Sequence, residues 1–246
     1  MKNVLLLLLL AACSDSDSVT PLTSSEASFV RGEFVEVTLI DADSRNESLD
    51  YLCADAREIM DAGAVPVAAF EVFGEDRGGW VNWSDDALAR TGEHYLITTW
   101  PSEAAFDAAA TERSRRAERA GVQTSSTFGP IGADVDYTFD PALGYEVGSG
   151  ENTDPALAME FLGLVRPMQA PWGVFDILGT TGAPGRASAT YNRNFLVLVE
   201  WASPERFVEH QSDPNSPVNV NIEMRRRFVP EDTLEITTNF FLVDPC

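Results

Sequence analysis

Two acidic residues occupy matching places in otherwise apolar segments of this 246-residue chain. Glu71 lies within the segment FEVFG, and Asp176 lies within the segment FDILG. Strict alternation along a strand places Glu71 on the side of Phe73 and Asp176 on the side of Leu178. A buried carboxylate is costly unless it is paired or protonated, so a repeated one is a candidate general base with a raised pKa. The alternative, an acid at a strand end or paired with an arginine, stays open.

A histidine provides a third candidate for proton transfer. His210 follows Trp201 on a segment with helical spacing, and imidazole is the side chain that most often accepts a proton near neutral pH. We therefore include His210 with Glu71 and Asp176 as a candidate catalytic residue. A hydrogen-bonded or solvent-facing histidine without a catalytic role is the alternative.

Aromatic residues gather in two long segments that have no helical or strand pattern. The segments 74–93 and 179–194 carry Trp80, Trp83 and Tyr191. Loops of this length are often functional, and small-molecule sites combine apolar walls with a few polar groups. These residues and Trp201 are therefore candidate ligand-binding residues for a small apolar or aromatic molecule. Packing of the same aromatics as minor cores is the alternative.

The N-terminus has the features of a bacterial lipoprotein precursor. Met1, Lys2 and Asn3 precede an apolar run that ends in Leu-Ala-Ala before Cys13. A membrane-spanning helix needs about 20 apolar residues, and this run has roughly half of them. We expect a signal peptide at 1–12 and a lipidated Cys13 with a flexible Ser/Asp-rich tether at 13–28. The predicted location is the cell envelope, in the outer membrane facing the periplasm, with membrane contact through the anchor only.

The composition of the chain limits the classes of binding partner and cofactor that we expect. The formal net charge of −22 repels phosphate backbones, so nucleic acid is not an expected partner. Beyond Cys13 the chain has Cys53 and Cys246, and an exported protein can keep a disulfide between them. The alternative is a buried thiol at Cys53 and an unpaired Cys246. No Cys and His spacing typical of a metal site occurs, and no cofactor is expected.

An internal repeat organises the rest of the chain. The segments 70–74 and 175–179 match at an offset of 105 residues, and the helical patterns before them keep that offset. We assign a first ferredoxin-like repeat to 29–140 and a second to 141–246. Each is expected to contain strand, helix, strand, strand, helix and strand. In the first repeat they span 33–41, 47–62, 65–73, 94–100, 102–120 and 130–139; in the second, 141–148, 154–169, 173–179, 194–201, 203–228 with a break at its prolines, and 233–243.

The predicted fold class is α+β. The second face of each ferredoxin-like sheet needs a cover, and two copies in one chain can cover each other. We therefore expect tandem ferredoxin-like repeats that form an intrachain pseudodimeric α+β barrel.

The second repeat resembles a known family. The segment after the strand 195–200 is similar to the strand and helix signature of antibiotic-biosynthesis monooxygenase-like domains, which belong to the dimeric α+β barrel superfamily. The first repeat keeps part of the pattern, but Ala109 stands where the second has His210. The residues that carry the resemblance in the second repeat are Trp201, Ser203, Pro204, Glu205, Phe207, His210, Ser212, Asp213 and Pro214.

This resemblance implies several chemistries, among them cofactor-free oxygenation of aromatic substrates, lactone isomerisation, and haem degradation or peroxidation. The haem-degrading branch has a ligating histidine ten residues after the position of His210, where this chain has Val220. Three functions remain open: a binding protein for a small apolar or aromatic molecule, a cofactor-free monooxygenase or isomerase, and an envelope protein-interaction module without catalysis.

Overall fold

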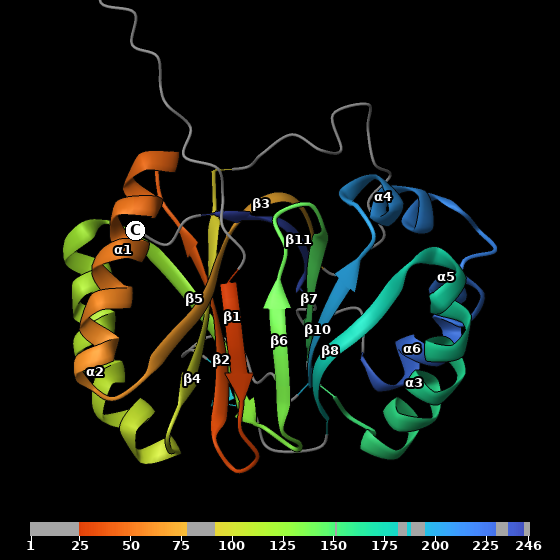
Figure 1. Ribbon diagram of the computed structural model, residues 1–246, viewed down its shortest axis with the longest axis horizontal. Helices are drawn as coiled ribbons and strands as arrows, with labels where there is room; N and C mark the ends of the chain where they lie inside the picture. Colours follow the sequence, from red (N-terminus) through yellow and green to blue (C-terminus); the bar gives the residue numbers. More distant parts are fainter. Residues whose placement is uncertain are drawn as a thin grey trace, which may run out of the picture.

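The computed structural model describes residues 25–77, 92–150, 152–181, 186–187, 195–229 and 236–243. Figure 1 shows a strongly curved sheet between two layers of helices, with α1 and α2 on one side and α3 to α6 on the other. The fold is therefore α+β, as the sequence predicts. Five predicted site residues lie outside the described residues: Cys13, Trp80, Trp83, Tyr191 and Cys246.

The first half follows the predicted order closely. Ser44 and Ser102 cap the two helices, each with its hydroxyl accepting a backbone N–H, and Gly121 ends α2 in the left-handed conformation that favours glycine. The elements are β2 (Phe34–Asp41), α1 (Arg45–Asp61), β3 (Val65–Arg77), β4 (His94–Trp100), α2 (Glu103–Ala120) and β5 (Gln123–Pro130).

The first two helices of the second half begin where the sequence predicts, near residues 154 and 203. Asp154 caps α3, and Ser203 caps α4, each followed by a proline in the first turn. Pro214 and Pro217 separate α4 from α5, as predicted. The elements are β7 (Gly144–Gly150), α3 (Pro155–Gln169), the 3-10 turn η1 (Ala170–Trp172), β8 (Val174–Thr181), β9 (Arg186–Ala187), β10 (Phe195–Trp201), α4 (Pro204–Ser212), α5 (Pro217–Val220), α6 (Ile222–Phe228) and β11 (Ile236–Val243).

The strand order is the same in both halves. The nine-stranded sheet runs β8-β10-β7-β11-β3-β4-β2-β5-β9 and is antiparallel throughout. Counted along the chain within each half, both read 4-1-3-2, which is the order of a ferredoxin-like unit. The halves join where β11 pairs with β3. The strands β5 and β10 also come into contact, although they are distant in this order, so the sheet bends back on itself.

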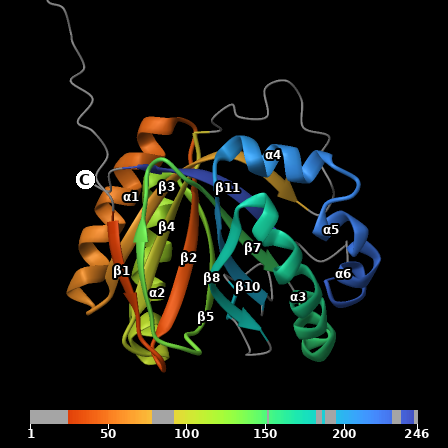
Figure 2. The same cartoon turned by 45° about the vertical axis from the view of Figure 1, so that its right-hand side comes forward.

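The concave side of this sheet, here called the inner face, holds the largest core. A separate two-stranded sheet, β1 (Ser25–Phe29) and β6 (Val135–Phe139), lies over it (Figure 2). Phe29, Phe70, Phe139 and Tyr145 are buried together there with the aliphatic side chains of β2, β3, β4, β8 and β10. The opposite side, here called the outer face, packs against the helices. The inner face is therefore filled largely by the protein's own side chains.

Two predicted boundaries are wrong. The last strand of the first half is β5 at 123–130, whereas we expected 130–139; residues 135–139 form β6 and pair with β1. The sequence pattern did not indicate β5 because the strand begins with a polar run at an end that is not fully buried. These residues are Gln123, Thr124, Ser125 and Ser126. Residues 25–28 of the predicted tether belong to β1, where Ala27 is buried against the inner face.

Cys53 on α1 is disulfide-bonded. Its partner lies outside the described residues, so the pairing with Cys246 stays a prediction.

Candidate functional site

His210 and Trp201 come together on the outer face of the second half. The ring centroids of His210 and Trp201 are 5.0 Å apart, and those of His210 and Trp172 are 5.3 Å apart, both edge to face. His210 is 1% exposed, and neither ring nitrogen has a hydrogen-bond partner among the described residues. A neutral imidazole carries one donor and one acceptor, and leaving either unsatisfied when buried is unfavourable by about 1–3 kcal/mol. This arrangement needs an explanation beyond packing.

The local sequence positions His210 on α4. The Ser203 cap and Pro204 fix where the helix begins, and Phe207, one turn before His210, packs edge to face on Trp201 at 5.1 Å. Phe207 and His210 are three residues apart and therefore share one face of the helix, which they turn toward the sheet. Val174 and Val199 complete the apolar surroundings.

Burial decides the protonation state of His210. Loss of hydration lowers the pKa of His210 to about 4, against the opposing effect of the nearby Asp213. The imidazole is therefore neutral at physiological pH and can donate one hydrogen bond and accept another. The indole of Trp201 is held in place separately, because its Nε1 donates to Glu146 at 2.8 Å.

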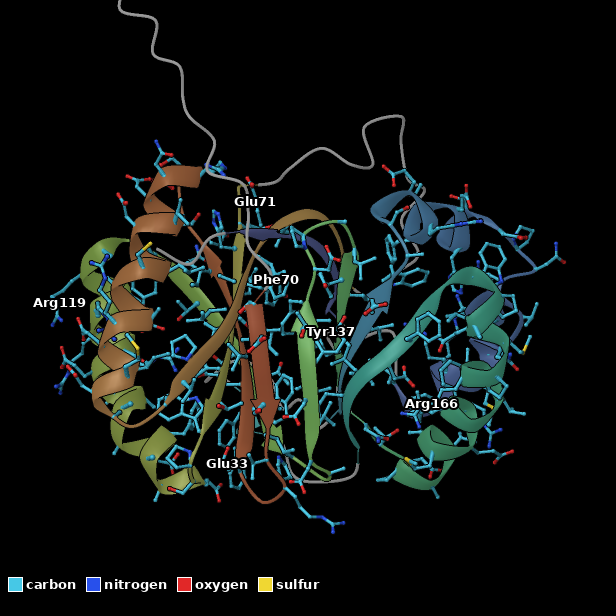
Figure 3. The ribbon with its side chains drawn as sticks, in the orientation of Figure 1. Glu33, Phe70, Glu71, Arg119, Tyr137 and Arg166 are labelled. Carbon is cyan, nitrogen blue, oxygen red and sulfur yellow. The ribbon has the colours of Figure 1, made fainter. Side chains whose placement is uncertain are left out.

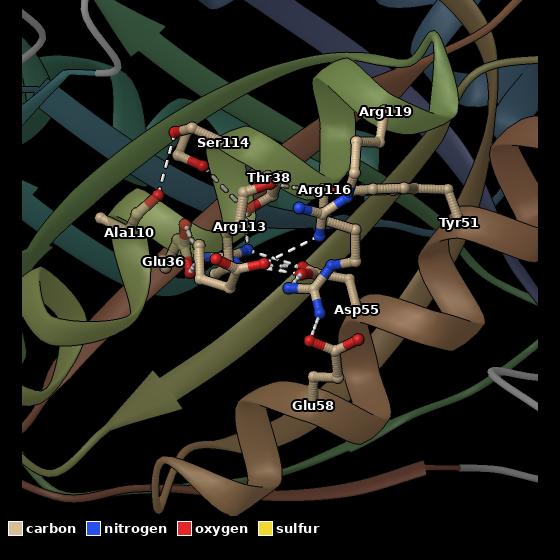
Figure 4. A network of polar contacts seen from close by, with 12 residues as sticks. Glu36, Thr38, Tyr51, Asp55, Glu58, Ala110, Arg113, Ser114, Arg116 and Arg119 are labelled. Atoms are coloured by element: carbon tan, nitrogen blue, oxygen red, sulfur yellow. Dashed lines mark hydrogen bonds and ion pairs between the residues drawn. The ribbon is translucent and has the colours of Figure 1, made fainter.

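The corresponding region of the first half is closed by ion pairs. Trp100 Nε1 donates to Glu36 at 2.9 Å, which matches the bond between Trp201 and Glu146. Arg113 donates to Glu36 at 2.8 Å and to Asp55 at 2.7 Å, with both carboxylates buried (Figure 4). Burial acts to lower the pKa of Arg113, but the two carboxylates outweigh this effect and raise the pKa above its usual range. This network has a structural role.

Glu71, labelled in Figure 3, lies on β3 in the first half, and its ion pair with Arg45 of α1 places it on the outer face. It is fully buried and accepts from Arg45 Nε at 2.6 Å and Nη2 at 3.1 Å. His94, its cross-strand neighbour, lies 2.6 Å from Ser48 Oγ through Nδ1. The arginine partner compensates for the burial of the Glu71 carboxylate, as the structural alternative expected. A catalytic role for Glu71 stays a prediction.

Asp176 is also ion-paired, with Arg166 of α3. A β-bulge lies beside it, since Val199 pairs with Asp176 while Leu198 pairs with Leu178. Alternation predicted Asp176 and Leu178 on one face, but the extra residue in the bulge puts Asp176 on the outer face and Leu178 in the inner core. Glu71 therefore lies on the outer face of the first half, whereas Asp176 lies on the outer face of the second half, as His210 does. A catalytic role for Asp176 stays a prediction.

Sequence reasoning did not include one polar cluster in the candidate site. Glu200, on the inner face of β10, accepts a hydrogen bond from the Tyr137 hydroxyl of β6, and Figure 3 shows Tyr137 between the two helix layers. Burial and this bond to Glu200 raise the pKa of Tyr137, so its hydroxyl stays protonated and remains a donor. The available signal was a carboxylate in the apolar segment FLVLVEW.

Within the part of the chain that the structure describes, no group of three or more His, Cys, Asp or Glu side chains is placed to hold a metal ion. No helix in that part is both long enough and apolar enough to cross a membrane.

The comparisons with known proteins concern the fold. No protein-family model matches the chain, and no curated protein matches its sequence. A crystal structure of an anthrone oxidase-like protein aligns with a TM-score of 0.58 at 11% identity, covering 89% of this chain and 94% of that one. The two chains share a fold. A mutant chlorite dismutase from Candidatus Nitrospira defluvii aligns at a TM-score of 0.45 and 9% identity, over 87% of this chain and 93% of its own, which is too weak for any inference.

Proposed function

We propose that this protein binds a small aromatic molecule that carries a hydroxyl group, beside His210 in the second half. The observation that carries this proposal is the buried, neutral imidazole between two tryptophan rings, with both nitrogens unpartnered among the described residues. A hydroxyl can accept from one nitrogen or donate to the other, and an aromatic ring can pack on the indoles.

The proposal includes a pseudodimeric barrel formed by two repeats. The shared 4-1-3-2 strand order and the equivalent Trp–Glu hydrogen bonds of the two halves support it. In this alignment Ala109 takes the place of His210, and Arg113 takes the place of Pro214. The first repeat then fills its outer face with the Arg113 network, and the second keeps a histidine without such a network. One binding centre per chain is the result.

The pKa of His210 favours a role for this residue in ligand binding over a role as a general base. A general base works best with a pKa near the operating pH, and a value of about 4 makes the neutral imidazole a weak base. It remains a good hydrogen-bonding group. The structural relative is described as anthrone oxidase-like, and an anthrone is aromatic, but this likeness shows the fold alone. A cofactor-free monooxygenase or isomerase is therefore the second candidate, and an interaction module without a ligand is the third.

Entry of a ligand requires motion, because His210 is buried. The helix α4 has nine residues and ends before Pro214, so few helical hydrogen bonds tie it to the following segment. We infer that α4 moves away from β10 to admit the ligand. Trp172 and Trp201 then report binding through their fluorescence.

A fluorescence titration with 2-naphthol and naphthalene tests the proposed site. The wild-type protein, purified in detergent from the membrane fraction, should bind 2-naphthol about tenfold or more tightly than naphthalene, because one hydrogen bond in an apolar site contributes about 1.4 kcal/mol. Trp201→Phe should weaken 2-naphthol binding, and the matched variant Trp100→Phe should leave it unchanged. Equal affinity for both probes, or equal effects of the two variants, would contradict the proposal.

We also propose that the protein is an envelope lipoprotein anchored through Cys13. The variant Cys13→Ala should move from the membrane fraction to the soluble fraction and lose incorporation of labelled fatty acid, because the acyl chains are the expected source of membrane affinity. The matched variant Cys53→Ala should remain in the membrane fraction. Retention of Cys13→Ala in the membrane would refute lipid anchoring at this residue.

A further inference from the structure

The carboxylate of Glu200 has an unusual setting on the inner face. It is half-buried beside an otherwise apolar core, and the Tyr137 hydroxyl is its hydrogen-bond partner among the described residues. No described arginine, lysine or histidine forms an ion pair with it. A carboxylate that is partly shielded from water and has no ion-pair partner favours a cationic ligand, so this position suits one.

Aromatic residues flank Glu200 on the same face. Glu200 pairs with Phe175 of β8 on one side and with Tyr145 of β7 on the other. Directly opposed residues in antiparallel strands project to one face with their Cβ atoms about 5 Å apart. Tyr145 is fully buried, whereas Phe175 is 53% exposed although it is a large apolar side chain. Tyr145, Glu200 and Phe175 therefore form a row across three adjacent strands, from the buried core to a solvent-accessible aromatic ring.

We propose that Glu200, Tyr137 and Phe175 form a second binding site, which takes a small organic ammonium ion. The free carboxylate oxygen of Glu200 accepts the ammonium group, and the Tyr137 hydroxyl orients the carboxylate by donating to the other oxygen. The exposed ring of Phe175 provides an apolar and π-rich surface for the organic part of the ligand. The net charge of −22 raises the local concentration of cations of this class.

This site is separate from the one around His210. Side chains alternate along β10, so Glu200 faces the inner core while Trp201 faces the helices. A neutral aromatic ligand suits the outer site, and a cation suits the inner one. The two sites can therefore be tested independently on one protein.

Isothermal titration calorimetry with benzylammonium, and with benzyl alcohol as its neutral counterpart, tests the proposal on the full chain in detergent. Benzylammonium should bind at least tenfold more tightly than benzyl alcohol, a ratio that corresponds to one charge-assisted hydrogen bond. Glu200→Gln should weaken benzylammonium binding at least tenfold while keeping the hydrogen bond from Tyr137. Glu160→Gln, which removes an exposed carboxylate of α3, serves as the matched control for net charge.

Each outcome of this experiment either supports or overturns the proposed ammonium site. Loss of binding in Glu200→Gln with retention in Glu160→Gln supports the site, provided that the melting temperatures of both variants match the wild type. If Glu200→Gln unfolds early, Phe175→Ala at the exposed rim replaces it and should also weaken benzylammonium binding. Equal affinity for both probes, equal effects of both glutamate variants, or no binding to the wild type overturns the proposal. The variant His210→Phe should leave benzylammonium binding intact, so failure here is distinct from failure at the outer site.

Discussion

Replacing Arg113 with alanine is expected to lower the free energy of unfolding by about 3–5 kcal/mol, because the change leaves the buried Glu36 carboxylate without a counter-charge and Asp55 with Arg116 alone. Glu36 is fully buried and the Asp55 side chain is 1% exposed, so water cannot substitute readily for the guanidinium. The substitution also removes the cation from above the Trp100 ring, 5.7 Å from its centroid. Urea denaturation followed by tryptophan fluorescence measures the change.

Another arginine of α2 provides the control for Arg113. Arg119 pairs with Glu112 on the surface, where both side chains are more than half exposed. Exposed pairs of this kind contribute about 0–1 kcal/mol, so Arg119→Ala should be nearly neutral. A cost below about 1 kcal/mol would mean that the network contributes no more than a surface ion pair.

The sequence predicts the helices and most strands of this fold because their signals are local. The caps at Asp154 and Ser203 and the break at Pro214 depend on residues within one or two turns. The strand β5 was misplaced because it begins with a polar run, and β1 was missed because its stability comes from pairing with β6 more than 100 residues away. Long-range pairing of this kind leaves no mark in the local pattern.

The site could be predicted only where its parts are close in sequence. Trp201 and His210 belong to one strand–helix signature, and the structure does bring them into contact. The bonds between Arg113 and Glu36 and between Tyr137 and Glu200 join residues 77 and 63 positions apart. Their pairing depends on the sheet order. Asp176 was assigned to the wrong face because a β-bulge, which has no reliable sequence signal, shifts the alternation by one residue.

Replacing His210 with phenylalanine is expected to stabilise the protein while removing its preference for a hydroxylated ligand. A phenyl ring is planar and aromatic like imidazole, is only slightly larger, and carries no unsatisfied donor or acceptor. The free energy of unfolding at pH 7.5 should rise by about 1–3 kcal/mol, the cost of the unpaired groups that the change removes. In the naphthol titration the variant should bind 2-naphthol and naphthalene with similar affinity.

The pH dependence of stability separates this explanation from general improvement in packing. The pKa of His210 is about 4 in the folded protein and about 6.5 in the unfolded chain, so between these values the unfolded chain binds a proton that the folded protein does not. Wild-type stability therefore falls as the pH is lowered through this window, by about 2 kcal/mol between pH 7.5 and pH 5 from this residue. The difference in free energy of unfolding between His210→Phe and the wild type should increase by the same amount between pH 7.5 and pH 5, as measured by urea denaturation.

These results bear on why a histidine occupies this position. If His210 had only a structural role, its removal would destabilise the protein or leave stability unchanged. The pH dependence follows from burial of the imidazole in either case, so the sign of the stability change and the loss of probe discrimination decide between the two roles. A variant that is more stable, most of all in acid, and that has lost discrimination between the two probes indicates that stability has been exchanged for binding. The combination is expected of a binding site and not of a core residue, because a core residue has no reason to retain two unsatisfied polar atoms.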